Sequence, residues 1–194
     1  MRALRPFLAA GVLLGLAACQ SIPAVPAGPM TLGAAEVTLG REWSNVSALL
    51  PGANKKVTVL SIDGPLLNRL YVTDGLAVGD SLVKKAAKEK PTPKLRAGMN
   101  SSERMEFVAD SIAAMGYQRV ETTKPRPARF GGEMAVRFDL SARTEDGLEV
   151  RGAALAAETG GKSYFVIYMA PGEHYFEASL PEVEAVMASA KPRA

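Results

Sequence analysis

The chain has 194 residues, one cysteine and one histidine, and its formal charge at neutral pH is +3. Hydrophobic residues make up 47% of it and charged residues 22%, a globular balance that excludes a disordered chain. A single cysteine excludes a disulfide-stapled miniprotein and any zinc site built from several cysteines.

Residues 1–18 have the pattern of a secretory signal peptide. Arg2 and Arg5 give a positive start, and the apolar run from Phe7 to Leu16 is too short to span a bilayer as a stable helix. Removing this segment with its two arginines lowers the formal charge from +3 to +1. A charge so close to zero argues against a nucleic-acid partner.

The signal segment ends in Leu16-Ala17-Ala18-Cys19, which resembles the lipobox of bacterial lipoproteins. The resemblance implies cleavage before Cys19, lipidation of its thiol and acylation of the new amine. Several acyl chains give stable membrane anchoring. Gln20, where an aspartate would favour the inner membrane, implies an outer-membrane lipoprotein that faces the periplasm. The alternative is that Cys19 is merely a small residue in an ordinary signal peptide.

Residues 19–35 are predicted to form the lipidated N-terminus and a flexible linker. Pro23, Pro26 and Pro29 recur at every third position among small residues, which favours an extended chain. About 16 such residues would reach about 50 Å from the membrane. A single α+β globular domain is then predicted for residues 36–194.

The first half of this domain is predicted to contain a hairpin and two helices. Residues 57–62 and 67–73 are rich in β-formers and flank an Asp-Gly-Pro turn. A short helix is predicted from Asp80 or Ser81 towards residue 91. A clearer helix over 103–115 has apolar residues spaced on one face, Asn100 or Ser101 as its N-cap and Gly116 after its end.

The second half is predicted to contain three strands and a final helix. Strands over 133–142, 148–157 and 162–169 are joined by Asp-Gly and Gly-Gly turns. Ser179 has capping-box spacing to Glu182, so the last helix is predicted to begin there. The predicted fold class is α+β, an antiparallel sheet flanked by helices in an α/β/α-like sandwich.

The last 60 or so residues resemble PsbP/Mog1-like domains. The resemblance follows Gly161-Lys162-Ser163-Tyr164, continues through Tyr168-Met169-Ala170-Pro171 to Phe176, and ends in a helix. It implies an antiparallel sheet flanked by helices, used mostly as a non-catalytic accessory or binding module. The whole chain also resembles uncharacterised lipoproteins of α-proteobacteria.

Gly79-Asp80-Ser81-Leu82 matches the signature of GDSL esterases, in which the serine is the nucleophile. That chemistry needs a histidine base with an acid to orient it. His174 is the only histidine, and Pro171 occupies the position of the family's acid. The tetrapeptide is therefore interpreted as a chance match at a helix cap, and no catalytic, cofactor or metal residues are predicted.

Residues 84–96 carry a dense basic segment that is a candidate surface for an anionic partner. The alternative is a solvated face without a partner. A second basic stretch, with Lys124, Arg126 and Arg129 around Pro125 and Pro127, has the same two interpretations, and a solvated, flexible loop is favoured. The basic residues of the first segment are Lys84, Lys85, Lys88, Lys90, Lys94 and Arg96.

Taken together, these features predict a lipid-anchored envelope lipoprotein with a non-catalytic binding or structural domain. Its expected partners are the membrane, through the lipid on Cys19, and another envelope protein or anionic envelope component. Two alternatives stay open: an esterase that uses Ser81, and a carrier of a lipid or other apolar ligand in the gap between sheet and helices.

Overall fold

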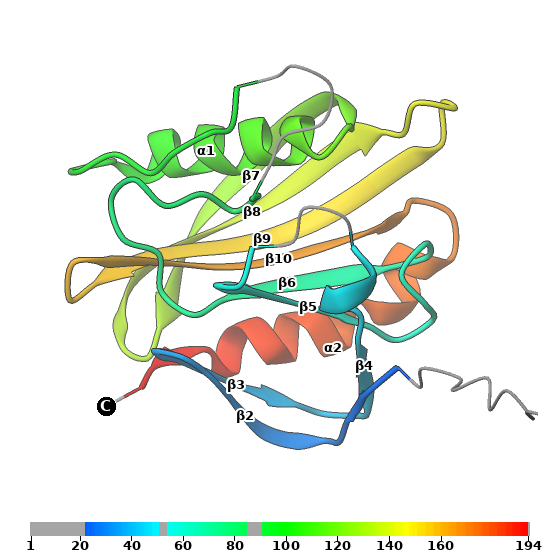
Figure 1. Cartoon of the computed structure of the whole chain (residues 1–194), viewed down its shortest axis with the longest axis horizontal. Helices are drawn as coiled ribbons and strands as arrows, with labels where there is room; N and C mark the ends of the chain where they lie inside the picture. Colours follow the sequence, from blue (N-terminus) through cyan, green and yellow to red (C-terminus); the bar gives the residue numbers. More distant parts are fainter. Residues whose placement is uncertain (1–21, 51–53, 85–90, 194) are drawn as a thin grey trace, which may run out of the picture.

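The computed structural model describes residues 22–50, 54–84 and 91–193. An antiparallel sheet of eight strands forms the centre of the molecule (Figure 1), and a second, three-stranded sheet packs beside it. The large sheet contains, in spatial order, β1 (Ala24–Val25), β4 (Trp43–Asn45), β5 (Val57–Ser61), β6 (Arg69–Thr73), β10 (Lys162–Pro171), β9 (Glu149–Thr159), β8 (Glu133–Arg143) and β7 (Gln118–Phe130). The small sheet contains β11 (Lys191–Pro192), β3 (Ala35–Leu39) and β2 (Gly28–Leu32).

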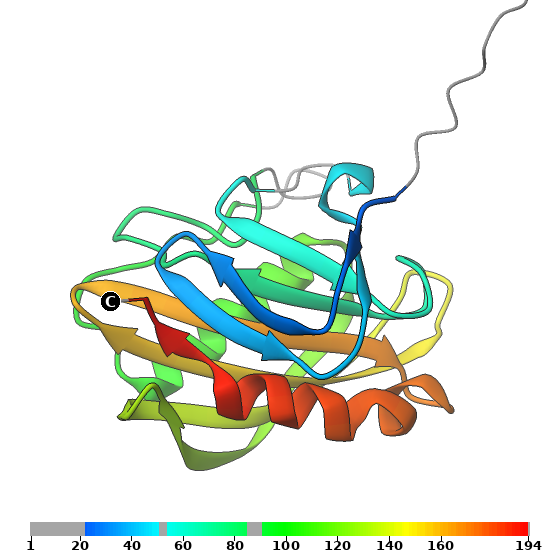
Figure 2. The ribbon, with the colours of Figure 1, turned by 90° about the horizontal axis from the view of Figure 1, so that it is seen from below.

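The two α-helices cover opposite faces of the large sheet. Helix α1 (Ser101–Ala114) packs on one face, whereas α2 (Tyr175–Ser189) and the small sheet pack on the other (Figure 2). A short 3-10 helix, η1 (Ser47–Leu49), follows β4. The predicted fold class, an antiparallel sheet flanked by helices, is confirmed.

Two hydrophobic cores lie on the two faces of the sheet, and the alternation of side chains along each strand separates them. In β10, Tyr164, Val166 and Tyr168 face α2, while Phe165 and Ile167 face α1. The neighbouring β9 is rich in alanine, which lets both helices approach the sheet. The gap in which an apolar ligand was considered is occupied by fully buried side chains of the fold, including Val108, Ile112, Phe138, Val183 and Val186.

Helix α1 has the N-cap and the terminal glycine that the sequence predicted, but it begins at Ser101 and ends at Ala114 where 103–115 was expected. The Asn100 side chain accepts a hydrogen bond from the Glu103 backbone N–H at 3.0 Å, and the Glu103 carboxylate accepts one from the Asn100 backbone N–H at 2.8 Å. This capping box satisfies two N–H groups that the first turn cannot bond internally. Gly116 follows with φ +105°, a conformation that only glycine adopts without strain.

Helix α2 begins at Tyr175, four residues before the predicted start at Ser179. Burial of the Phe176 ring explains the extra turn, since that ring is 3% exposed, stacks on Tyr168 and lies 4.5 Å from the Arg151 guanidinium. Ser179 is therefore an interior residue of the helix and not its cap. Tertiary packing here outweighs the local capping signal.

Strand β7 replaces the loop that was predicted around Pro125 and Pro127. It is the edge strand of the large sheet, where a proline without an N–H removes no ladder bond on the open side. The register shifts between Thr123 and Arg126, and Lys124 has φ +51°, so a bulge accommodates the first proline.

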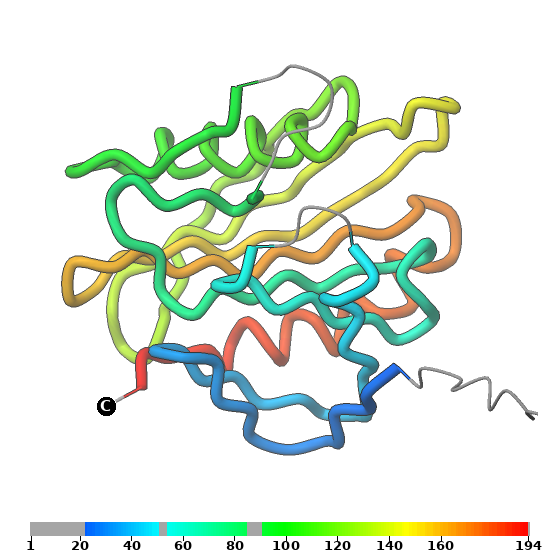
Figure 3. Tube along the Cα trace, in the orientation of Figure 1, coloured from blue at the N-terminus to red at the C-terminus, as the bar shows by residue number. Residues whose placement is uncertain are grey.

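The predicted linker also proves to be folded over most of its length. Strands β1 and β2 lie within residues 19–35, and the Asn45 N–H donates to the Pro23 carbonyl at 2.8 Å. Pro29 lies in β2, again an edge strand, of the small sheet. The described fold thus begins near Pro23 and not at residue 36. Figure 3 shows this start on the opposite side of the molecule from the C-terminal strand. Cys19 lies outside the described residues.

Residues 80–84 do not form the helix predicted to begin at Asp80 or Ser81. The Asp80 carboxylate instead accepts hydrogen bonds from the Ala77 N–H at 2.8 Å and from Lys56 Nζ at 2.6 Å. These bonds hold a turn in which the backbone pairs with Leu95. The rest of that predicted helix, residues 85–90, lies outside the described residues.

Candidate functional site

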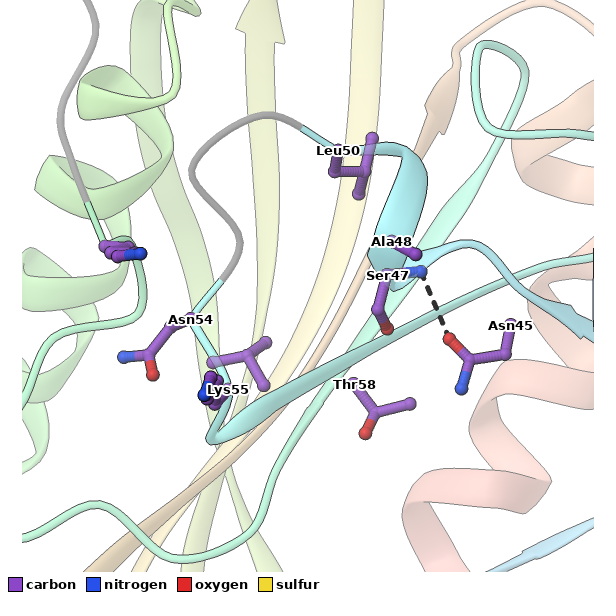
Figure 4. Close-up of a pocket in the computed structure, with 9 residues that line it drawn as sticks. Asn45, Ser47, Ala48, Leu50, Asn54, Lys55 and Thr58 are labelled. Carbon is purple, nitrogen blue, oxygen red and sulfur yellow. Dashed lines mark hydrogen bonds between the residues drawn. The ribbon is translucent and has the colours of Figure 1, made fainter.

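An open pocket of about 500 Å³ lies between η1, the residues that lead into β5, and the segment that carries Lys84 (Figure 4). Its described lining combines two lysines with four uncharged polar residues and three apolar ones. None of the lining residues in the described part of the chain carries a carboxylate. The lining residues are Asn45, Ser47, Ala48, Leu50, Asn54, Lys55, Val57, Thr58 and Lys84.

Hydrogen bonds between side chains and backbone shape the walls of this pocket. The Ser47 N–H donates to the side-chain Oδ1 of Asn45 at 3.1 Å, as Figure 4 shows, and the Val59 N–H donates to Ser47 Oγ at 2.8 Å. The first bond closes the turn between β4 and η1, and the second fastens η1 to β5. The Asn54 side chain accepts from the Lys56 N–H at 3.0 Å and donates to the Ser81 carbonyl, which ties the turn before β5 to the turn before Lys84.

Two ammonium groups give the pocket its charge. Lys55 and Lys84 are both exposed, and within the described part of the chain neither side chain makes a hydrogen bond or ion pair. Their neighbour Lys56 differs, because its Nζ pairs with Asp80. That hydrogen bond, together with the one from the Ala77 N–H, lowers the pKa of Asp80 below its ordinary value. The pocket therefore offers an anionic group, such as a phosphate or carboxylate, positive charge that no described residue pairs.

The predicted basic segment is divided by the structure. Lys84 lines the pocket, whereas Lys94 Nζ donates to the Gly79 carbonyl at 3.1 Å and Arg96 pairs with Glu103 at 3.3 Å. Lys85, Lys88 and Lys90 lie outside the described residues. Lys55 was not singled out from the sequence, although Asn54-Lys55-Lys56, directly before a strand, was a visible basic turn.

The charged groups beside α2, in contrast, satisfy one another. The Arg137 side chain is only 5% exposed, and its guanidinium pairs with Glu184 at 2.6 Å and with Asp139 at 3.0 Å. Arg126 bridges the same two carboxylates, at 3.4 Å each. This cluster therefore holds β7, β8 and α2 together and leaves little charge for a partner.

The two residues of the possible esterase site lie on opposite faces of the sheet. Ser81 is 6% exposed, its Oγ accepts from the Val83 N–H at 3.2 Å, and the adjacent Leu82 packs in the core beneath α1. His174 is exposed at the start of α2, on the other face, with its ring edge-on to Tyr175. The structure thus does not bring the hydroxyl and the imidazole together.

Replacing Ser81 by alanine is expected to lower the free energy of unfolding by about 1 kcal/mol, because the Val83 N–H loses its acceptor. The same change is expected to leave any hydrolysis of p-nitrophenyl acetate unchanged. Urea denaturation and an ester-hydrolysis assay measure the two effects. Turnover that disappears in the variant would restore the esterase hypothesis.

None of the helices in the described ranges is both long and apolar enough to cross a membrane. Among the same residues, no group of three or more histidine, cysteine, aspartate or glutamate side chains is arranged to hold a metal ion.

No protein-family model and no curated protein sequence matches the chain. Solved structures do. Cyanobacterial PsbP (CyanoP) from Synechocystis is 15% identical, with a TM-score of 0.56 over 96% of this chain and 99% of that one. The Ran-binding protein Mog1p of Saccharomyces cerevisiae is 9% identical, with a TM-score of 0.52 over 88% of this chain and 95% of that one. The protein has a PsbP/Mog1-like fold.

The likeness to these two structures covers 96% and 88% of the chain, far more than the C-terminal stretch in which the sequence resembles PsbP/Mog1-like domains. A third structure, of LpqN from Mycobacterium tuberculosis, which is involved in cell envelope biogenesis, has a TM-score of 0.40 and 10% identity over 89% of this chain and 92% of that one. That score is too low to establish a shared fold. Identities in this range carry over no functional residues, so the site rests on its own geometry.

Proposed function

We propose that this protein is a lipid-anchored lipoprotein of the bacterial cell envelope whose PsbP/Mog1-like domain binds an anionic group without catalysing a reaction. The pocket with Lys55 and Lys84 carries the binding part of the proposal, since it is open and cationic and has no carboxylate among its described lining residues. The fold is compatible with such a role, because Mog1p is a Ran-binding protein. The sequence up to Cys19 supports the anchor, and Gln20 supports an outer-membrane location facing the periplasm.

Binding is tested by titrating the purified mature protein with sn-glycerol 1-phosphate and following its backbone amide signals by NMR. Saturable shifts with a dissociation constant of millimolar order are expected at Asn45, Ser47 and Asn54, since two unpaired lysines in an open pocket give modest affinity. The double variant Lys55→Gln, Lys84→Gln is expected to lose these shifts. A matched pair elsewhere, Lys124→Gln with Lys162→Gln, should keep them. Equal shifts in both double variants would contradict the proposed site.

Anchoring is tested at Cys19, the single cysteine. In the mature wild-type protein, a thiol reagent is expected to leave the unfolded chain unlabelled, because the sulfur would be in a thioether. Cys19→Ala is expected to move nearly all of the protein from the membrane fraction to the soluble fraction or to leave it unprocessed. A Cys19→Ala variant that still pellets with membranes, or a wild-type chain that labels fully, would contradict the anchor.

A further inference from the structure

The distance between the proposed lipid anchor and the fold is short. The sequence pattern predicted a linker that reaches about 50 Å, but the described fold begins with Pro23, whose carbonyl is bonded to Asn45. Only three residues separate Cys19 from Pro23. Even a fully extended chain covers at most about 14 Å over that stretch. The interfacial layer on each side of a bilayer takes up about 5–8 Å of this distance.

The cationic pocket lies where the chain enters the fold. Asn45, which bonds to Pro23, is one of the pocket's lining residues. Figures 1 and 2 both show the beginning of β1 beside η1. A short anchor therefore holds this side of the domain, and not the side of the C-terminal strand, against the membrane.

The same surface carries exposed apolar side chains among its positive charges. Leu49, at the end of η1, is 50% exposed, and Ile22, just before β1, is 43% exposed. Lys55 and Lys84 lie in the adjoining pocket without ion pairs in the described part of the chain. Lysines beside exposed apolar residues are the combination by which proteins bind an anionic membrane interface.

We infer that the pocket is a docking surface for phospholipid head groups, so that the domain lies on the membrane that holds its anchor. In this arrangement Lys55 and Lys84 bind lipid phosphates, and Leu49 and Ile22 enter the interface. The short tether limits how far this side of the domain can move from the anionic surface, and the attraction of a lysine to that surface falls off over a Debye length of about 8–10 Å. The inference rests on the proposed anchor and specifies which anionic component the pocket binds.

The test measures the depth of Leu49 in the lipoprotein. Leu49→Cys is labelled with an environment-sensitive fluorophore, and the protein is reconstituted in vesicles of phosphatidylethanolamine with one quarter phosphatidylglycerol. The emission is expected to shift to the blue and to be quenched by brominated lipids. Met134→Cys is the matched control, because Met134 is another exposed apolar residue, at 64%. It is the second residue of β8 and follows the turn whose Gly131 N–H donates to the Ala190 carbonyl near the C-terminus. Its label is expected to stay in water.

Charge is tested in the same labelled protein. Each lysine near an anionic surface contributes about fivefold to the docked population, so Lys55→Gln with Lys84→Gln is expected to reduce it about 25-fold. Lys124→Gln with Lys162→Gln should leave the quenching unchanged. Replacing phosphatidylglycerol by phosphatidylcholine should act like the pocket variant.

Failure of this inference is distinguishable from failure of the anchor. If the protein floats with the vesicles but the Leu49 label stays in water, the anchor holds and docking is overturned. Quenching that persists in the pocket variant overturns the binding of head groups by the two lysines. If the protein does not float with the vesicles at all, the anchor itself is wrong and docking fails with it.

Discussion

Replacement of Glu184 by alanine is expected to lower the free energy of unfolding by about 3 kcal/mol. Glu184 accepts from both Nε and Nη2 of Arg137, at 3.1 and 2.6 Å. Arg137 is 4% exposed, so removing its main partner leaves a buried cation with only Asp139 to compensate it. The Glu184 side chain is 40% exposed, which lets water reach the vacated space and keeps the loss at the lower end for such pairs.

Urea denaturation measures this loss. Two further variants show whether it comes from helix propensity or from the broken pair. Glu106→Ala, at an exposed position of α1, makes the same change in helix propensity and is expected to cost less than about 0.5 kcal/mol. The double variant Arg137→Met, Glu184→Ala is expected to lose clearly less than the sum of its two single changes, because it buries no unpaired charge. Additive losses would show that the two side chains do not act as a pair.

Strands β8, β9 and β10 could be predicted because two independent signals agree there. Alternating apolar residues mark the strands, and Asp146-Gly147 and Gly160-Gly161 supply the positive φ that tight turns need. Strands β2 and β7 could not be predicted, because their prolines are compatible with a strand only at a sheet edge. Edge position is a property of the whole topology, which no local sequence pattern contains.

The candidate site shows the same limit at the level of side chains. Lys84 lay in a visibly basic segment, so the sequence could single it out. Lys55 gains its significance only because the Asn54 amide bonds to the Ser81 carbonyl and brings two distant turns together. Lys94 and Arg96 looked equivalent to Lys84 in the sequence, yet each has its own partner in the fold. Basic composition thus indicated the region, and tertiary contacts determine which of its charges have no partner among the described residues.

At Gly152, the addition of a single methyl group is expected to lower the free energy of unfolding strongly. Gly152 lies in the middle of β9, paired with Leu140 of β8 and Met169 of β10. A Cβ placed there would lie 2.7 Å from the Tyr168 carbonyl oxygen, 2.7 Å from Met169 Sδ and 2.9 Å from Leu140 Cβ. Met169 could turn aside, but the carbonyl belongs to the backbone of the adjacent strand and cannot.

Gly152→Ala is therefore expected to force β9 and β10 apart and to lower the free energy of unfolding by about 2–3 kcal/mol. Gly172→Ala is the matched control, since its Cβ would meet only the Arg151 side chain, at 3.3 Å, and a backbone carbonyl at 3.8 Å. That control is expected to change stability by less than about 0.5 kcal/mol, because an exposed arginine side chain can move. Thermal and urea unfolding of both variants compare the two sites. Equal stability of the two variants would contradict this expectation. It would mean that β9 and β10 can accommodate a methyl group at Gly152 without loss of stability.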